Sequence, residues 1–361
     1  MTSAIELGYY PSTFEPFKFM DYYLGDAFGA FGMTGYGKSI LVGNIAVELS
    51  KSRNIIIFDY NGDYRNLKHV NIRNAQRKFS SISDLVYIHR FGFKLQDFDK
   101  PFDWEIAGMS ETGARICAAK AGMREYHRND YNKFVALIDE IPTKGKNSEM
   151  YMVKLGIKNR LKILKDVFID KCVDITYRDV DSIRYHGIPF YISDWKYFIE
   201  AHKHICLNMN SEFNPAKAQL FAGKIMSETE VAMPRLNPVI VIEEAHKLCP
   251  NVYDEGNIPY SVIKILHYLK ELHKKGVKLI LISQYPHQLQ DEVMDEIKHF
   301  FIGKLQNIRG SSKLDEMFKM SSSLQFNHLS GYREFLHYSP LYNEKNVFIP
   351  YDSFTYYEKR K

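Results

Sequence analysis

The sequence lacks any apolar run close to the ~20 residues that a membrane-spanning helix needs. Its first residues, MTSAIELGYY, do not form a signal peptide. Cysteine is scarce, and its four positions are scattered without the spacing of metal ligands. We therefore expect a cytoplasmic protein with free, buried thiols at Cys117, Cys172, Cys206 and Cys249.

Low-complexity tracts and motifs that read bases or bind RNA are also missing from the 361 residues. The net charge of +5 is modest, so it allows a nucleic-acid partner without strongly indicating one. Hydrophobic residues make up 45% of the chain and charged residues 25%, which is ample for one large or two ordinary domains. Composition therefore limits the fold, and the function has to be inferred from motifs.

The segment GMTGYGKS, residues 32–39, fits the phosphate-loop pattern G-x-x-x-x-G-K-[ST]. In such a loop the backbone N–H groups surround phosphates, the lysine reaches the terminal phosphates and the serine hydroxyl binds Mg²⁺. A helical pattern follows, and its positive N-terminal end would point at the anion. A glycine-rich turn that matches by chance is the alternative. The residues expected to bind ATP are Gly32, Thr34, Gly35, Tyr36, Gly37, Lys38, Ser39 and Ile40, with Mg²⁺ at Ser39.

Several short apolar runs are typical of strands buried on both faces of a parallel sheet. Helical patterns separate most of them, and the clearest spans 261–275, with Ser261 as the expected N-cap and Gly276 as the stop. This alternation predicts a doubly wound α/β core that ends in two strands, EFLHYS and NVFIPY. The runs are NIIIF (54–58), ICLNM (205–209), PVIVI (238–242), KLILIS (278–283) and FFIGKL (300–305), with AFGAF as a weaker strand before the phosphate loop.

Residues 96–200 break this rhythm, because they contain few strand-like runs and several helical ones. YNKFVALIDEI places four apolar residues on one helical face, and SDWKYFIEAHKH opens with a cap at Ser193 or Asp194. We therefore predict an α/β core formed by residues 1–95 and 201–361, interrupted by a helical insertion over 96–200.

Two acidic residues follow the run PVIVI, at the end of a predicted strand. A carboxylate at this end of a parallel strand faces the ligand crevice. There Glu243 would hold Mg²⁺ through water beside Ser39, and Glu244 would polarise the attacking water. A solvated turn with two acids is the alternative. Asp139–Glu140 also follows an apolar run, but its spacing suits the end of an amphipathic helix.

A glutamine, Gln284, follows the predicted strand KLILIS within the segment SQYP. Its amide can hydrogen-bond both a terminal phosphate and the attacking water, so it would sense whether that phosphate is present. An ordinary glutamine at a strand end is the alternative.

Together these motifs resemble the HerA/FtsK superfamily of ring-forming, DNA-pumping ATPases, and within it the HerA branch. The matching segments are GMTGYGKS, IIIFDYNGDY, VIVIEEAHKL and LILISQYPHQL, followed by FIGKL and, more loosely, LSGYREFLHYS. The resemblance covers roughly residues 20–95 and 200–345, with only KPFDWEI matching inside the insertion. The combination of EEAH with SQ-P is more specific than the phosphate loop alone.

The resemblance implies a RecA-like P-loop NTPase core, usually hexameric, that moves duplex DNA through a central channel. Asp59 and Asp63, in DYNGDY, would lie at the tip of the second strand and line the site. Matched by position, the resemblance implies that Lys38 and Ser39 bind the nucleotide and Mg²⁺. It likewise implies that Glu243 and Glu244 form the acidic pair and that Gln284 is the sensor.

Two features depart from the family pattern. Members commonly carry a β-barrel before the core, whereas about 20 residues precede it here. A ring ATPase usually completes each site with an arginine from the neighbouring subunit. The family often has an arginine before the strand KLILIS, where this chain has Lys274 and Lys275, which lack the forked geometry of arginine. The best candidate for this arginine is Arg309, with Arg235 behind it.

The segment 144–171 is basic, with eight Lys or Arg and three Asp or Glu. Four lysines share one face of a predicted helix, and four apolar residues share another. Such a face would contact DNA phosphates without sequence specificity, and its affinity would fall steeply with salt. An ordinary solvated face is the alternative. The lysines are Lys154, Lys158, Lys162 and Lys165.

These observations predict an ATP-hydrolysing, Mg²⁺-dependent translocase of double-stranded DNA, assembled as a ring and, by resemblance, a hexamer. It could package a viral or plasmid genome, process DNA ends with a nuclease or pump DNA between cells, and the composition favours a virus or mobile element. A nucleotide-gated DNA-binding or assembly module with little hydrolysis is the alternative, although a switch does not need two strand-tip carboxylates. A small-substrate kinase is a third hypothesis, which the chain length and the lack of an arginine-rich lid disfavour.

Overall fold

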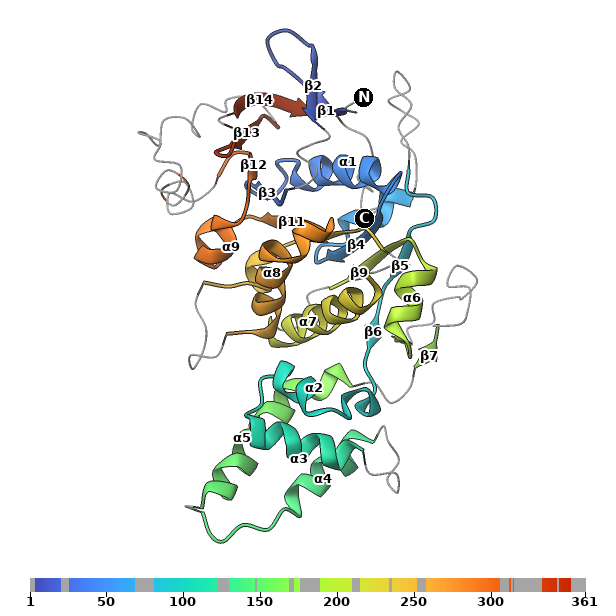
Figure 1. Ribbon diagram of the computed structural model, residues 1–361, viewed down its shortest axis with the longest axis vertical. Coiled ribbons are helices and arrows are strands. Elements are labelled where there is room, and N and C mark those ends of the chain that lie inside the picture. Colours follow the sequence, from blue (N-terminus) through green and yellow to red (C-terminus); the bar gives the residue numbers. More distant parts are fainter. Residues whose placement is uncertain are drawn as a thin grey trace, which may run out of the picture.

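The parallel sheet expected from the sequence forms the core of the protein (Figure 1). Within the described residues, 11 strands form one sheet in the order β2–β1–β14–β13–β12–β3–β11–β10–β4–β9–β5. The computed structural model describes residues 4–20, 26–68, 81–122, 130–146, 148–168, 172–175, 189–209, 215–233, 236–251, 258–305, 312, 314, 333–342 and 344–351.

The strands from β12 to β5 in that order run parallel, and the remaining four extend the sheet by antiparallel pairing. All five apolar runs predicted as strands are confirmed, although β12 is shorter than predicted, and AFGAF supplies β3. The parallel strands are β12 (His299–Ile302), β3 (Phe28–Phe31), β11 (Lys278–Ser283), β10 (Pro238–Ile242), β4 (Asn54–Asp59), β9 (His204–Asn208) and β5 (Val86–Ile88). The antiparallel strands are β13 (Phe335–Ser339), β14 (Glu344–Pro350), β1 (Ala4–Tyr9) and β2 (Pro16–Met20).

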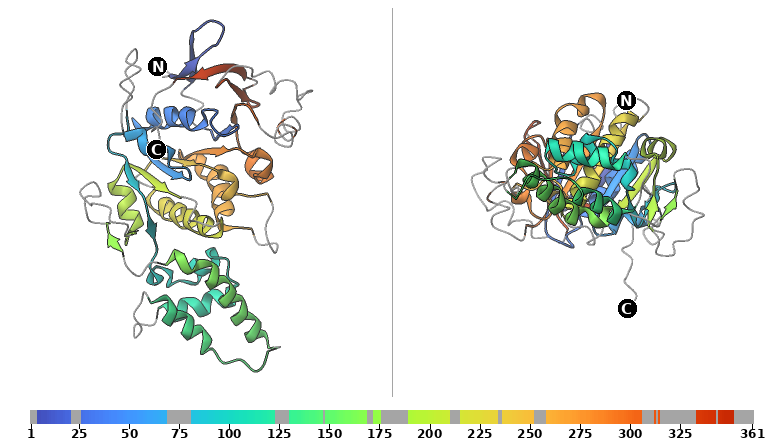
Figure 2. Two further views of the ribbon diagram at one scale, coloured as in Figure 1. Left: turned by 180° about the vertical axis from the view of Figure 1, so that it is seen from behind. Right: turned by 90° about the horizontal axis from the view of Figure 1, so that it is seen from below.

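Helices cover both faces of this sheet, as Figure 2 shows from two further sides. In β4, Ile55 and Ile57 pack in the hydrophobic cluster that includes α1, whereas Ile56 and Phe58 pack in the cluster that includes α7 and α8. This alternation is why the strands are apolar at nearly every position. Among the described residues, no helix combines the length and apolar character that crossing a bilayer requires. The core helices are α1 (Lys38–Ser50), α6 (Trp195–Ala201), α7 (Pro215–Ala232), α8 (Tyr260–Lys270) and α9 (Asp291–Asp295).

The helix predicted over 261–275 is divided in the structure. The α-helix α8 ends at Lys270, and a 3₁₀ turn over Leu272–Lys275 follows it. Gly276 ends that turn with φ 91°, as predicted. The predicted N-cap was wrong: Pro259 occupies that position, because its φ of −57° and ψ of 140° lie outside the helical region. Ser261 is instead buried and donates its hydroxyl proton to the carbonyl of Leu248.

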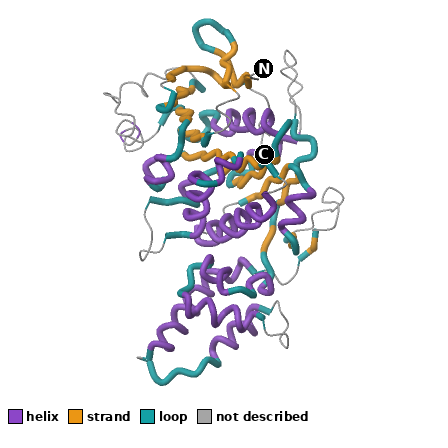
Figure 3. The backbone as a smooth tube through the Cα atoms, viewed as in Figure 1, coloured by secondary structure: helices purple, strands orange, loops and turns teal. Residues whose placement is uncertain are grey.

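Four helices form a subdomain at the end of the molecule opposite the β1–β2 hairpin (Figures 1 and 3). Three of them begin at a side chain that accepts a hydrogen bond from the third helical N–H group, namely Ser110, Asp130 and Ser148. The helical insertion is therefore present, while its boundaries at 95/96 and 200/201 stay a prediction. A small sheet, β6–β8–β7, was not expected. The elements are β6 (Phe91–Gly92), α2 (Pro101–Ile106), α3 (Glu111–Ala121), α4 (Tyr131–Asp139), α5 (Glu149–Leu164), β7 (Val173–Asp174) and β8 (Phe190–Tyr191).

A poorly hydrated ion pair joins this subdomain to the core. Asp103 of α2 and Lys224 of α7 lie 2.6 Å apart, with 6% and 13% of their side chains exposed. The ring of Phe102 packs edge-on against Tyr260 of α8, with 5.5 Å between ring centres. The subdomain is therefore attached to the core by a charged contact and an aromatic contact on the same side of the sheet.

Removing Lys224 should leave the buried Asp103 carboxylate without this ion pair, and removing Asp103 should leave Lys224 with the more exposed Glu228, 3.7 Å away. We expect Asp103→Ala or Lys224→Met to lower the free energy of unfolding by about 3–5 kcal/mol, and the double substitution to cost less than the two together. Urea denaturation measures all three. The exposed pair Glu111–Arg115 is the matched control, where Glu111→Ala should change stability by less than about 1 kcal/mol. Equal losses at both pairs would contradict the buried character of the junction.

Candidate nucleotide-binding and catalytic site

Four neighbouring parallel strands, β3, β11, β10 and β4, end at the same edge of the sheet. Their register places Phe31 beside Ser283, and Ile242 beside Phe58. The phosphate loop, the acidic pair and the segment DYNGDY begin directly after these positions, and the segment SQYP begins at Ser283 itself. Because parallel strands share one carboxyl edge, residues more than two hundred positions apart in the sequence meet there.

The phosphate loop has the backbone that its glycines permit. Gly35 and Gly37 have φ values of 75° and 103°, in the region that residues with a side chain rarely adopt. Gly37 is the N-cap of α1, so the loop leads directly into the positive end of that helix. Beneath the loop, the Tyr36 ring is buried 5.7 Å from the ring of Phe335, and Ile40 is also buried. Both side chains therefore pack in the core, and the Tyr36 N–H group donates to the carbonyl of Met33 at 3.3 Å.

Lys38 lies folded into its own loop. Its ammonium donates hydrogen bonds to the carbonyls of Gly32 at 2.7 Å and Met33 at 3.0 Å, and only 8% of the residue is exposed. Burial lowers the pKa of Lys38, and nearby carboxylates, led by Glu244, oppose that shift. The ammonium thus has partners that an incoming phosphate could replace.

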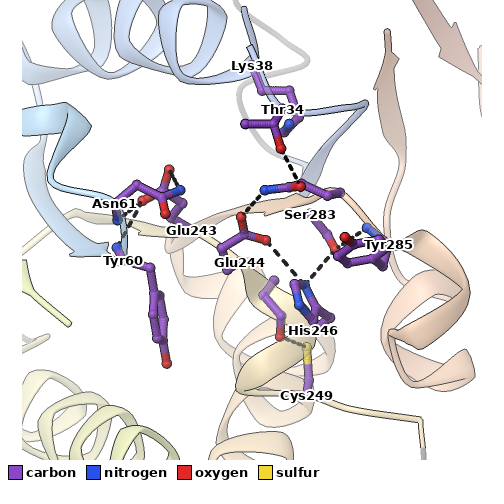
Figure 4. Close-up of polar contacts among 12 residues, drawn as sticks. Thr34, Lys38, Tyr60, Asn61, Glu243, Glu244, His246, Cys249, Ser283 and Tyr285 are labelled. Carbon is purple, nitrogen blue, oxygen red and sulfur yellow. Dashed lines mark hydrogen bonds and ion pairs between the residues drawn. The ribbon is translucent and has the colours of Figure 1, made fainter. Parts of the chain in front are cut away.

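Glu243 fastens the loop that follows β4 (Figure 4). Its Oε2 accepts from the backbone N–H groups of Tyr60 and Asn61, each at 2.9 Å, and its Oε1 accepts from the Asn61 side chain at 2.9 Å. Burial, together with the neighbouring Asp59, raises the pKa of Glu243 well above its ordinary value. The prediction that Glu243 holds Mg²⁺ therefore stays open, since both of its oxygens are already hydrogen-bonded to this loop.

Asp59 and Asp63 have different places in the same loop. Asp59 is fully buried, and its carboxylate accepts from the backbone N–H groups of Gly62, Asp63 and Tyr64 at 2.8 to 3.2 Å. This turn brings Asp63 to the phosphate loop, where its Oδ2 accepts from the Ser39 hydroxyl at 2.7 Å. Asp63 is therefore the carboxylate in direct contact with Ser39.

The adjacent residue Glu244 points away from the loop after β4, toward Gln284 and His246. Its φ of 48° and ψ of 47° are left-handed, which is uncommon for a residue other than glycine. Its Oε1 accepts from the Gln284 amide, and its Oε2 lies 3.4 Å from Nδ1 of His246. The Gln284 carbonyl oxygen in turn accepts from the Thr34 hydroxyl at 2.6 Å. The predicted water-activating and sensing residues thus touch each other, and Gln284 also touches the phosphate loop.

The oxygen groups around Ser39 fit the preferences of Mg²⁺. Ser39 and Asp63 supply hard oxygen atoms, and Mg²⁺ normally completes its six positions with water and the substrate's phosphates. No cluster of three or more His, Cys, Asp or Glu suited to a metal occurs among the described residues. A metal that arrives with the nucleotide fits this arrangement better than one held by a protein cage.

Two residues near the site were missed by the sequence prediction. The Cγ and Cδ atoms of Arg333, which precedes β13, lie 3.6 Å from the point where a Cβ on Gly37 would stand. Arg333 has a left-handed φ of 64°. His246 contacts Glu244, as described above. The segments LSGYREFLHYS and EEAH contained both residues, but a single arginine or histidine has no periodic signal that would single it out.

The arginines proposed to act between subunits, Arg309 and Arg235, lie outside the described residues. Lys274, which stands where the family often has arginine, is exposed and lies 3.7 Å from Glu271. Asp139 and Glu140 end the amphipathic helix α4, as the spacing predicted.

Two of the four lysines proposed to contact DNA are engaged within the subdomain. The Lys154 ammonium donates to the carbonyls of Asp139 and Ile141, and Lys158 forms an ion pair with the Asp139 carboxylate at 2.7 Å. Lys162 and Lys165 are exposed. Of the four lysines, Lys154 and Lys158 therefore bind α4 and its C-terminal residues, and Lys162 and Lys165 remain on the surface.

The sheet and the site define a P-loop NTPase with a RecA-like core. A family model described as the central domain of the helicase HerA matches residues 20–186. VirB4 of Thermoanaerobacter pseudethanolicus is similar in structure, with a TM-score of 0.60, 14% identity and 97% of both chains covered. The bacterial conjugative coupling protein TrwB, in a form designated ΔN70, has a TM-score of 0.59 and 10% identity over 99% of this chain and 91% of its own.

The genome packaging NTPase B204 from Sulfolobus turreted icosahedral virus 2 is less similar, with a TM-score of 0.46, 12% identity and 91% and 98% of the two chains covered. That score is below the level that indicates the same fold. No curated protein sequence matches this chain. The family model confirms the predicted resemblance to the HerA branch of the HerA/FtsK superfamily, and the similar structures confirm the RecA-like fold.

A side chain at Gly35 should impair nucleotide binding beyond its effect on stability. Apart from their neighbours in the chain, no described residue has an atom within 4 Å of a Cβ built on Gly35 or on Gly145, and both residues have left-handed φ values. Alanine at either position should therefore cost about 1–2 kcal/mol of backbone strain. Only Gly35→Ala should also weaken binding of a non-hydrolysable ATP analogue, by about 10-fold or more, because it displaces an N–H group that would meet phosphate.

Calorimetric titration and thermal unfolding of both variants separate these effects. Equal loss of affinity in Gly145→Ala would argue against a specific role for the loop.

Proposed function

We propose that this protein is a Mg²⁺-dependent ATPase that moves double-stranded DNA and works as a ring, by resemblance a hexamer. The observation that carries the proposal is the convergence of the phosphate loop, the acidic pair and Gln284 at one edge of the sheet. The 2.6 Å contact between Thr34 and Gln284 supports it most directly, because it joins the loop to the sensor. The HerA family match and the conjugative coupling protein among similar structures support DNA as the cargo.

Each group has a chemical task in the proposed hydrolysis. The loop N–H groups and Lys38 bind the phosphates, and Lys38 exchanges its two carbonyl partners for phosphate oxygens. Ser39 and Asp63 would hold Mg²⁺, with Glu243 acting through water. The metal ion would neutralise charge on the β- and γ-phosphates. Glu244 accepts a proton from the attacking water, and Gln284 orients that water for in-line attack on the γ-phosphorus, opposite the oxygen of the leaving ADP.

Charge on the transferred phosphoryl group also needs a cation. Arg333 lies against Gly37 of the same chain, and we propose that it contacts the nucleotide's phosphates in cis. Arg309, or Arg235 in its place, remains our proposal for an arginine from the neighbouring subunit. Sites completed between subunits would make hydrolysis depend on ring assembly.

Replacing the proposed water-activating group should stop turnover while the nucleotide still binds. We expect Glu244→Gln to lower kcat for ATP hydrolysis by about 10²–10⁴-fold and to leave affinity for ATP largely intact. Lys38→Ala should weaken binding as well, because it removes a phosphate contact. Phosphate release assays and equilibrium nucleotide binding measure the two effects.

Glu296→Gln, at a half-buried acid beyond the site, is the control and should behave as the unchanged protein. Normal hydrolysis by Glu244→Gln would show that the assignment is wrong. Mass measurement and ATPase rates with and without duplex DNA then distinguish the functions: strong stimulation in a ring supports the motor, whereas an unstimulated monomer supports the nucleotide-gated module.

The helical insertion offers a test of DNA contact. If the exposed lysines meet phosphates, Lys162→Ala and Lys165→Ala should each weaken duplex binding and reduce the slope of log affinity against log salt by about 1. Lys158→Ala should affect stability more than binding, because its ammonium already pairs with Asp139. Fluorescence anisotropy over a range of salt concentrations measures the slopes, and unchanged slopes in the first two variants would exclude this face as the DNA contact.

A further inference from the structure

His246 lies between the two strand tips that supply the proposed catalytic groups. It belongs to the 3₁₀ turn Ala245–Lys247, and 12% of its side chain is exposed. Its Nδ1 lies 3.4 Å from Oε2 of Glu244 and 3.1 Å from the hydroxyl oxygen of Ser283 at the end of β11. The Ser283 oxygen also accepts from the backbone N–H of Tyr285 at 3.0 Å. His246 thus links the acidic pair of β10 to the segment that carries Gln284 (Figure 4).

The proton on this imidazole can be placed from its neighbours. Burial lowers the pKa of His246, so the ring is neutral near pH 7 and carries one N–H group. The carboxylate of Glu244 can only accept a hydrogen bond, and in the described part of the chain no donor lies at hydrogen-bond distance from its buried Oε2. A proton on Nδ1 is therefore the arrangement that gives this oxygen a donor, at a distance that a small closure would turn into a full hydrogen bond.

Glu244 needs external support for its orientation. Its left-handed backbone is strained, and such a conformation persists only when the surroundings fix it. One support is the Gln284 amide, which also accepts from Thr34 and would have to serve the terminal phosphate and the water. Among the described residues, His246 is the support for Glu244 that nucleotide binding would not draw away.

We propose that His246 is a positioning residue for Glu244. Its Nδ1–H group is shared between Oε2 of the carboxylate and the hydroxyl oxygen of Ser283, which keeps the imidazole in place. The second carboxylate oxygen then stays aimed at the attacking water when Gln284 turns to the phosphate. This inference rests on the proposed role of Glu244 in ATP hydrolysis. His246 itself touches neither the nucleotide nor the water.

Substitution of His246 by asparagine or by glutamine tests whether Nδ1 or Nε2 of the imidazole positions Glu244. An asparagine amide places its N–H group close to the position of Nδ1, whereas the longer glutamine amide reaches toward the position of Nε2. We expect His246→Ala to lower kcat by about 10–100-fold, as a misplaced catalytic group does, with little change in KM or in affinity for an ATP analogue. His246→Asn should recover most of the lost rate, and His246→Gln should not.

A double-substitution cycle tests the link through β11. Ser283→Ala should lower kcat by a smaller factor, and combining it with His246→Ala should add nothing further, because the serine acts through the imidazole. His267→Ala is the matched control, since His267 of α8 is 37% exposed and pairs with Glu230 of α7. It should leave kcat unchanged.

The outcomes separate this inference from the proposed function. Hydrolysis that depends on Lys38 but is unaffected by His246→Ala would overturn the role of His246 alone. So would rescue by glutamine in place of asparagine, or a parallel fall in kcat, analogue affinity and melting temperature, which would mark a purely structural residue. Absence of Lys38-dependent hydrolysis in the unchanged protein would overturn both.

Discussion

The parallel pairing of β3, β11, β10 and β4 is the constraint on which the site depends. Each strand is buried on both faces, so its register is fixed by two hydrophobic clusters at once. A shift by one residue would turn every side chain of that strand to the opposite face. Because the tips are held this firmly, four loops that are each polar and locally irregular meet at one edge with hydrogen bonds between them.

The acidic pair shows how a single backbone angle divides two adjacent carboxylates. The left-handed conformation of Glu244 directs it toward Gln284 and His246, while Glu243 stays with the loop after β4. One carboxylate thereby shapes the loop that presents Asp63 to Ser39, and the other is free of that task. In the proposed mechanism this separates the holding of the metal ion from the activation of water, although the two residues are neighbours in the chain.

The helical insertion shows a limit on what the periodicity of the sequence can predict. Lysines at helical spacing suggested one basic face; Lys154, Lys158 and Lys162 lie on α5, whereas Lys165 begins the 3₁₀ turn that follows it. The carbonyl groups at the end of α4 and the Asp139 carboxylate engage two of them, and this depends on how α4 packs beside α5. Periodicity shows which side chains share a face, but it does not show what another helix places opposite that face.

The sequence by itself determined the strands, most of the helices and the phosphate loop, because hydrophobic periodicity and glycine requirements act over short stretches of chain. It also determined which strand ends carry acidic or amide groups. The tertiary structure decided which of these groups touch: Asp63 rather than Glu243 at Ser39, Gln284 at both Thr34 and Glu244, and Arg333 against Gly37. These contacts depend on strand order, loop direction and one left-handed residue, all of which arise from packing between distant segments and leave no local pattern in the sequence.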